Sequence, residues 1–253
     1  MDICRQERLI PPNNTLKFQF LCNEPRFLLL TNDEKEYSVQ IKEAVLKIQK
    51  LELFPDVHDS FTAVFNKEPC IYHVLGSHFK QVEIAKGSTS VNIENLFNSS
   101  IIPSYCVLSF CDTSALSAGS YTKNPHYHPH KNLSSITITI AGNTKQRFLN
   151  FANKQYLGSY LEFLEVVGKH AIPFNAVNYI SFAEGYSFLA LNNKYSNAEG
   201  GNLIPEISKG NAVLNLRFSK PLDSNVSLLI YFKVPQKITL SRDKSVEIIP
   251  HLN

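Results

Sequence analysis

The sequence predicts an all-β protein, a jelly-roll β-sandwich of about eight antiparallel strands with one or two short helices in the connections. Two C-terminal stretches, 212–218 and 226–234, alternate apolar and polar residues with the period of two that a half-buried strand requires. The 17 Phe and 11 Tyr residues suit pleated surfaces. The expected strands are unevenly spaced and do not alternate with helices, which favours a jelly roll over an immunoglobulin-like sandwich.

The length of the chain is compatible with one domain. Its 253 residues are 43% hydrophobic, enough for a sizeable core, and β-sandwiches often reach this size as one unit. No repeat period and no low-complexity linker divides the sequence. We therefore expect a single jelly-roll domain over residues 1–253.

In the N-terminal half, apolar runs bounded by turn residues predict four strands and one short helix. The strands are expected over 16–22, 37–54, 70–84 and 105–110. Within 37–54 the apolar positions change parity near Lys50, and a β-bulge is the simplest cause. Pro55 opens the helix, because proline is favoured in the first turn and Val57, Phe61 and Val64 follow at helical spacing.

In the C-terminal half, the stretch 133–140 alternates isoleucine with threonine and predicts a strand that Ala141–Thr144 closes as a hairpin. A helix is expected over 154–167, ended by Gly168. Its apolar face is expected to comprise Leu157, Tyr160, Leu161, Leu164 and Val167. A strand over 186–191 and a polar loop over 192–202 follow.

The two C-terminal strands are expected to form a hairpin, because Lys220–Asn225 between them is rich in turn residues. In the second strand even the outer face is partly apolar, because it carries Leu229 and Tyr231. We therefore expect Leu229 and Tyr231 to be covered by a loop of the monomer or by another subunit.

Composition excludes several classes of function. The net charge is +3, and Lys and Arg are spread singly, so no dedicated nucleic-acid binding is predicted. No apolar run approaches the roughly 20 residues of a membrane span. Residues 1–7 are charged and lack the apolar core of a signal peptide, so assembly inside a cell is expected. The five cysteines form no C-x-x-C pair and are expected to be buried free thiols.

One cluster has the residue types of a metal site. His126, His128 and His130 recur at every second position, a spacing that suits Zn²⁺ or Fe²⁺, as in the metal-binding jelly rolls called cupins. However, Gly119 precedes His126 with one residue too many, and the glutamate expected after the second histidine is missing. A second cupin motif has no counterpart, so surface histidines at a strand entry are the preferred interpretation. A cupin-like metal-dependent enzyme remains an alternative.

Several motifs together carry a resemblance to a known family. In chain order they are Leu9–Asn13, Tyr37–Leu46, Gly119–Pro125 (G-S-Y-x-K-N-P), Tyr156 with Tyr160 and Leu161, Gly185–Phe188, Gly210–Leu214 and Arg217–Leu222. In this order they are similar to capsid-like proteins of Polinton (Maverick) elements and adintoviruses. The resemblance spans nearly the whole chain.

The resemblance implies the second jelly roll of a double jelly-roll major capsid protein, a class that forms trimers tiling an icosahedral shell. It implies a structural virion protein and not an enzyme, with no catalytic residue, cofactor, metal or small-molecule substrate. The implied partners are further copies, in a homotrimer, or other capsid proteins in a capsomer. The implied location is the virion, assembled in the cytoplasm or nucleus of a host cell.

Two features depart from the family. The sequence holds only one jelly roll, and His126 and His128 stand where the family is typically aromatic. A single jelly-roll vertex or receptor-binding protein is a further alternative.

Overall fold

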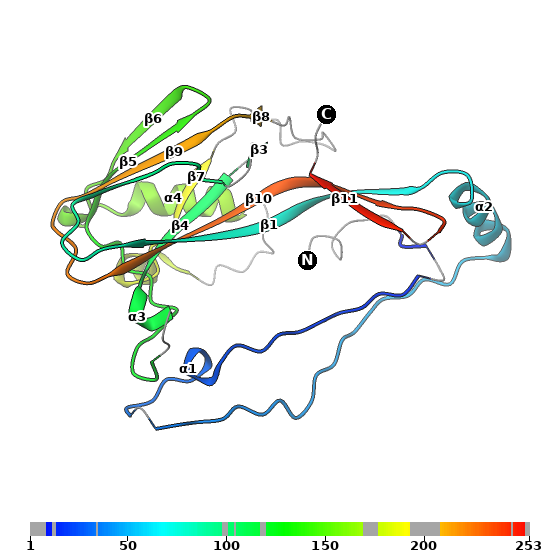
Figure 1. The fold of residues 1–253 in the computed structure, drawn as a ribbon, viewed down its shortest axis with the longest axis horizontal. Helices are drawn as coiled ribbons and strands as arrows, with labels where there is room; N and C mark the ends of the chain where they lie inside the picture. The colour runs from blue at the N-terminus through cyan, green and yellow to red at the C-terminus, as the bar shows by residue number, and fades with distance from the viewer. Residues whose placement is uncertain are drawn as a thin grey trace. The chain divides into compact units, whose positions relative to one another are not determined.

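A computed structural model describes residues 9–11, 14–33, 35–97, 101–103, 105–116, 120–168, 177–192, 208–243 and 245–250 (Figure 1). The chain divides into two compact units. The larger unit comprises Arg26–Lys35 and Ser77–Val234, and the smaller unit comprises Met1–Pro25, Glu36–Gly76 and Pro235–Asn253. The expectation of one domain over 1–253 remains a prediction.

The larger unit contains most of a sandwich of two antiparallel sheets, whose strands β1 and β10 each continue along the chain into the smaller unit. The first has the order β1-β10-β4-β7, formed by Cys70–Ile84, Val226–Leu240, Tyr105–Asp112 and Leu189–Asn192. The second has the order β2-β9-β5-β6, formed by Ser90–Ile93, Ala212–Phe218, Leu133–Ile140 and Asn143–Phe148. A short separate pair joins β3 (Ile101–Ile102) to β8 (Ser208–Lys209).

The order of these strands defines a jelly roll. Counted along the chain without the short β3 and β8 and without β11 (Val246–Pro250), the first strand pairs with the eighth, which lies beside the third and then the sixth. In the facing sheet the second strand pairs with the seventh, followed by the fourth and fifth. This interleaving of chain ends and middle is the jelly-roll arrangement. The predicted fold class is therefore confirmed.

Local chemistry explains the strands that the sequence predicted best. In β9, Ala212, Leu214, Leu216 and Phe218 are buried while the residues between them are half-buried or exposed. The predicted hairpin joins β5 to β6 through Ala141 and Gly142, which both have positive φ angles of 48° and 84°. Positive φ at both central residues is the requirement of a type I′ turn, whose twist matches that of paired strands.

The predicted C-terminal hairpin is wrong. β9 lies between β2 and β5, whereas β10 lies between β1 and β4 in the other sheet. The connection passes between the sheets and is held by Leu222, whose buried side chain joins the core. The Leu222 N–H donates to Ser88 O at 3.1 Å, and Leu222 O accepts from Gly87 N at 2.8 Å. These bonds to the β1–β2 connection explain why turn residues here do not make a hairpin.

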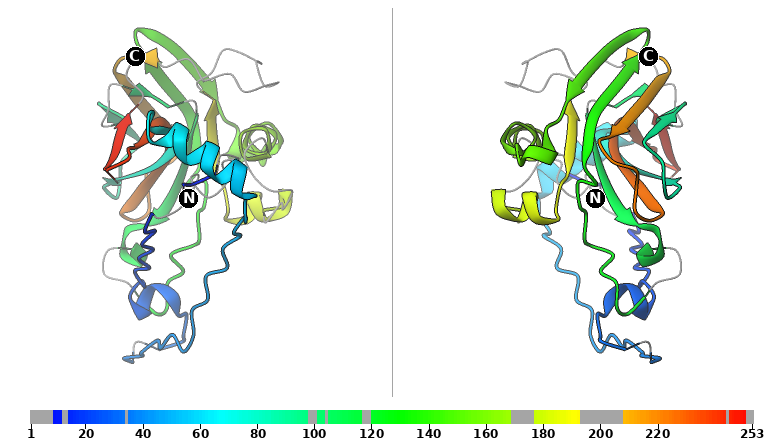
Figure 2. Two further views of the ribbon diagram at one scale, coloured as in Figure 1. Left: turned by 90° about the vertical axis from the view of Figure 1, so that its right-hand side faces the viewer. Right: turned by 90° about the vertical axis from the view of Figure 1, so that its left-hand side faces the viewer.

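The predicted helix exists as α4 (Leu157–Gly168), but its predicted face is wrong in part. Leu157 and Leu161 are 57% and 54% exposed, whereas Phe163 and Val166 are buried. α4 packs along β7, beside the sandwich (Figure 2). The shorter helices of this unit are α3 (Thr113–Leu116), the 3₁₀ turn Phe151–Asn153 and α5 (Tyr179–Glu184).

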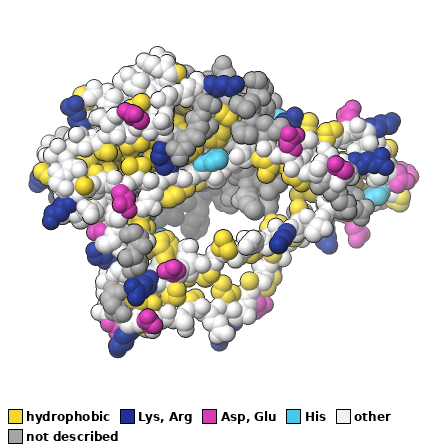
Figure 3. Space-filling view, viewed as in Figure 1, with side chains coloured by type: hydrophobic (Ala, Val, Ile, Leu, Met, Phe, Trp, Pro, Cys, Tyr) yellow, Lys and Arg dark blue, Asp and Glu magenta, His cyan; other side chains and the backbone are white. Residues whose placement is uncertain are grey.

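The smaller unit contains α2 (Pro55–Phe65), which begins at the predicted proline, and β11 (Val246–Pro250), which pairs with β10. The strands predicted over 16–22 and 37–54 are wrong. Both stretches lack regular structure apart from the adjoining short helix α1 (Pro25–Leu28), and their apolar side chains are largely exposed (Figure 3). No helix among the described residues is long and apolar enough to cross a membrane.

Candidate functional site

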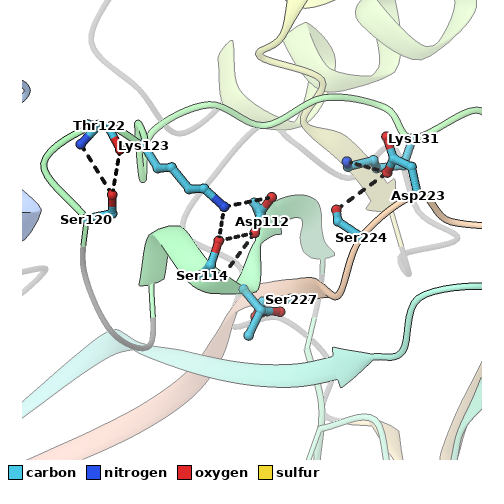
Figure 4. A network of polar contacts seen from close by, with 10 residues as sticks. Asp112, Ser114, Ser120, Thr122, Lys123, Lys131, Asp223, Ser224 and Ser227 are labelled. Atoms are coloured by element: carbon cyan, nitrogen blue, oxygen red, sulfur yellow. Dashed lines mark hydrogen bonds and ion pairs between the residues drawn. The ribbon is translucent and has the colours of Figure 1, made fainter. Parts of the chain in front are cut away.

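The loop that follows α3 carries the G-S-Y-x-K-N-P motif, and its polar residues bond to one another (Figure 4). Asp112 Oδ1 accepts hydrogen bonds from the backbone N–H and the hydroxyl of Ser114, at 3.0 and 2.6 Å. Lys123 Nζ lies 3.8 Å from Asp112 Oδ2 and donates to Ser114 Oγ. Partial burial alone would raise the pKa of Asp112, but these hydrogen bonds and the charges of Lys123 and Lys131 lower it.

The apolar residues of the motif anchor this loop to the larger unit. Tyr121 is buried, and its carbonyl accepts from Thr31 N at 2.8 Å. The guanidinium of Arg26 lies 5.5 Å from the centroid of the Tyr121 ring, within reach of a cation–π contact. The Pro125 carbonyl accepts a weak bond from the Cys111 thiol at 3.4 Å. The motif therefore connects this loop to Thr31, Arg26 and Cys111 through backbone, cation–π and thiol contacts.

The structure joins this loop to the second motif of the resemblance, Gly185–Phe188. His128 N donates to Gly185 O at 2.6 Å, and Ser187 N donates to His128 O at 2.9 Å. Gly185 has a φ of +158°, and a Cβ there would lie 2.1 Å from the Tyr127 ring. The glycine is needed because the aromatic ring occupies that space.

The three histidines do not converge. His126 packs against Phe27, His128 against Phe188, and His130 against Phe151 and Tyr156. His128 is 9% exposed, and its Nδ1 is buried without a hydrogen-bond partner. Burial lowers the pKa of both His128 and His130. In the described part of the chain no group of three His, Cys, Asp or Glu residues could hold a metal ion.

Four cysteines are described, and all are free thiols. Cys106 and Cys111 are buried, as predicted, and burial raises the pKa of their thiols to about 12 and about 11. Thiols held in the protonated form are weak nucleophiles. Cys22 is exposed and Cys70 is half-buried, so the prediction that the cysteines are buried is confirmed for only two of the four described cysteines.

A cavity of about 360 Å³ lies between β5, β6, β7 and α4, and the sequence did not reveal it. Its lining residues are Ile136, Ile138, Lys145, Gln146, Arg147, Glu162, Glu165, Val166, Ala190 and Leu191. The Arg147 guanidinium pairs with Glu162 and donates to Ser159 Oγ at 2.9 Å and to Ala190 O at 3.4 Å. Burial lowers the pKa of Arg147 to about 10, which leaves it charged at neutral pH.

The outer face of β10 is less covered than predicted. Tyr231 is 37% exposed, and its hydroxyl lies 3.0 Å from Ser77 Oγ. Leu229 is half-buried. No loop of the described chain covers Tyr231, so the first half of that expectation is wrong, while cover by another subunit stays a prediction. The expected polar loop 192–202 lies outside the described residues except for Asn192.

Comparison with solved structures finds similar chains in viruses. A chain of the PBCV-1 virus capsid is similar with a TM-score of 0.48 at 13% identity, covering 77% of this chain and 55% of that one. A chain of the Sputnik virophage has a TM-score of 0.41 at 11% identity, covering 74% and 40%. The mavirus major capsid protein has a TM-score of 0.36 at 10% identity, covering 74% and 42%.

The chain thus spans about half the length, or less, of these capsid chains. No protein-family model matches the sequence, and no curated protein is similar to it. The assignment of the jelly roll depends on the strand order described above.

Proposed function

We propose that the chain is a structural virion protein, a jelly-roll capsid component of a Polinton-like element or a related virus, which associates with further copies into capsomers. The observation that carries the proposal is the apolar surface that a single chain leaves in water. Contiguous exposed apolar surface of large extent is rare on monomers and marks interaction sites.

This surface follows the N-terminal stretches. The residues that are at least half exposed there are Leu16, Phe20, Leu21, Ile41, Val45, Leu46, Ile48, Leu51 and Phe54. Apolar side chains gain about 25 cal/mol for each Å² removed from water, so covering this set contributes favourably to assembly. Such a surface fits an assembling subunit better than a monomeric enzyme.

The roles of the motif residues support the same proposal. Lys123, Tyr121 and Gly185 serve packing and hydrogen bonding within the sandwich. None of these three residues lines the cavity beside α4. We propose a homotrimer, or a capsomer completed by other capsid proteins, and the virion as its location.

Light scattering and negative-stain microscopy on the purified protein test this proposal. Capsomer-sized particles with threefold outlines are expected, alone or after co-expression with the neighbouring gene products. Fivefold particles would instead favour the vertex-protein alternative. A protein that stays monomeric under all these conditions contradicts the proposal.

Elemental analysis of protein purified without an affinity tag tests the cupin-like alternative. Stoichiometric Zn or Fe that is lost in His126→Ala would support that alternative. We expect none, because the three histidine rings pack against different aromatic residues.

A further inference from the structure

β6 is the edge strand of its sheet, and its outer side offers backbone hydrogen-bonding groups (Figure 1). In a hairpin closed by a two-residue turn, the two residues that flank the turn form backbone hydrogen bonds to each other. Every second pair of opposite residues along the two strands does the same. Asn143, Lys145 and Arg147 therefore direct their N–H and C=O groups to β5. Thr144, Gln146 and Phe148 direct theirs outward, where the described residues supply no backbone partner.

A strand added at this edge would extend the wall that β5 and β6 form on one side of the cavity beside α4. Residues directly opposite in a sheet share a face, so Lys145 lies with Ile138, and Arg147 lies with Ile136. Ile136 and Ile138 belong to the core and form part of the floor of the cavity. Every second side chain of an added strand would therefore lie beside Lys145 and Arg147, with Ile136 and Ile138 one strand further in.

An inward-pointing charge on an edge strand often prevents such pairing. Here the charge of Arg147 is already neutralised by Glu162, and its other bonds go to Ser159 and Ala190. An incoming strand would leave these partners in place. The edge is therefore open to a further strand.

The same chain contains a segment with the pattern of a strand. Tyr37–Lys42 is as long as β6 and alternates Tyr37, Val39 and Ile41 with polar residues. Val39 and Ile41 are 40% and 61% exposed, and no hydrogen bond of the described chain reaches the backbone between 38 and 53. The next position on the apolar face is Glu43, whose charge is opposite to that of Lys145 on the inner face of β6.

We propose that Tyr37–Glu43 of one copy adds as a strand to the outer edge of β6 of a second copy, with Val39 and Ile41 on the face that carries Lys145 and Arg147, at the margin of the cavity. This inference rests on the proposed self-association and identifies the two segments that would be in contact. The single chain leaves its own segment exposed and its own cavity open, so donor and acceptor are both available for a second copy. Donor and acceptor are different surfaces, so the contact is head-to-tail and can close into a ring.

A matched pair of variants tests the contact. Ile41→Lys puts a charge on the inner face of the added strand, whereas Gln40→Lys puts the same charge on its outer face. Neither residue touches the core, so both variants should unfold in urea as the parent does. We expect Ile41→Lys to weaken self-association by about 10-fold or more, as for the loss of an interface anchor, and Gln40→Lys to leave it within about 2-fold. Equal association of Ile41→Lys and the parent overturns the inference.

Cross-linking identifies the donor and acceptor chains. A Gln40→Cys chain is mixed with a Gln146→Cys chain, both carrying Cys22→Ser, and treated with a short bismaleimide. We expect a cross-linked heterodimer, because the two positions lie on the same face of neighbouring strands. Association without this product overturns the inference while the proposed function stands. A control chain carries both Gln40→Cys and Gln146→Cys. If only this chain forms a cross-link, and does so within itself, the segment binds its own β6 edge and the contact with a second copy is overturned. A protein that is monomeric throughout overturns the proposed function itself.

Discussion

β9 and the stretch 37–54 share a pattern of alternating apolar residues but differ in burial. In β9, Leu214 and Leu216 are fully buried, whereas Leu46 and Ile48 are 50% and 56% exposed. β9 has a hydrogen-bonded neighbour on each side, β2 and β5, while the other stretch has none among the described residues. Alternation therefore determines which side chains share a face, but a neighbouring strand is needed to bury them.

Proline substitution tests this difference most strongly. Asn215→Pro removes a backbone donor from a central strand, because Asn215 pairs with both Asn92 and Thr137. We expect a loss of roughly 3 kcal/mol or more in the free energy of unfolding, or no folded protein. Lys47→Pro should change it by less than about 0.5 kcal/mol, since no ladder exists there. Urea denaturation measures both, and comparable losses would show that 37–54 is paired in the folded chain.

The helix α4 allows the same comparison between a buried and an exposed apolar residue. Phe163 packs against Phe182 and Phe188, so Phe163→Ala should cost about 3 kcal/mol. Leu161→Ala should change stability by less than about 0.5 kcal/mol, because the side chain is exposed. A large loss of unfolding free energy in Leu161→Ala would show that Leu161 lies on the buried face of α4, as the sequence predicted.

Acid should act on the sandwich through its buried histidines. Burial lowers the pKa of His128, so the fold keeps this ring neutral, whereas the unfolded chain has the ordinary value of about 6.5. As the pH falls below about 6.5, the unfolded state binds the proton first, and stability falls by up to about 1.4 kcal/mol per pH unit for each such group. His130 acts in the same direction.

The slope of stability against pH, measured by urea denaturation between pH 7 and pH 5, checks this prediction. His128→Phe keeps a ring against Phe188 and should reduce the slope. An unchanged slope would show that His128 does not contribute. The residues of 37–54 include no histidine, so their exposure leaves this slope unaffected.

The smallest effect is expected in the first turn of α4. A Cβ at Gly158 meets no atom within 4 Å, so Gly158→Ala should raise the free energy of unfolding by about 0.5 kcal/mol. Thermal denaturation measures the shift. Gly185→Ala is the matched contrast, because the Tyr127 ring occupies the space of its Cβ, and it should lower the melting temperature. A gain from both substitutions would contradict the packing at Tyr127.

Several elements could be predicted because local chemistry decides them. Pro55 begins α2, the strand over 70–84 has the predicted bounds, and Ala141-Gly142 forms the predicted turn. Each depends on residues within a few positions of one another. Nearest-neighbour backbone preferences and side-chain period are sufficient there.

The candidate sites depended on contacts that no local pattern reports. The spacing of His126, His128 and His130 suggested convergence, but aromatic residues from three parts of the chain separate the rings. Arg147 stands in a polar stretch, and only the fold brings Glu162 to it across the cavity. Side chains distant in sequence decide these environments, so spacing alone could not.

The type and period of the strands follow from the local order of residues, because side chains on an extended backbone must alternate between faces. The partners of the strands depend on the folded chain as a whole. β9 and β10 are consecutive along the chain but lie in opposite sheets, since Leu222 between them joins the core and bonds to the β1–β2 connection. The stretch 37–54 has a strand's pattern without a strand's neighbour. Pairing is a property of two segments together, and the free energy of each pairing depends on residues that may be far apart in the sequence.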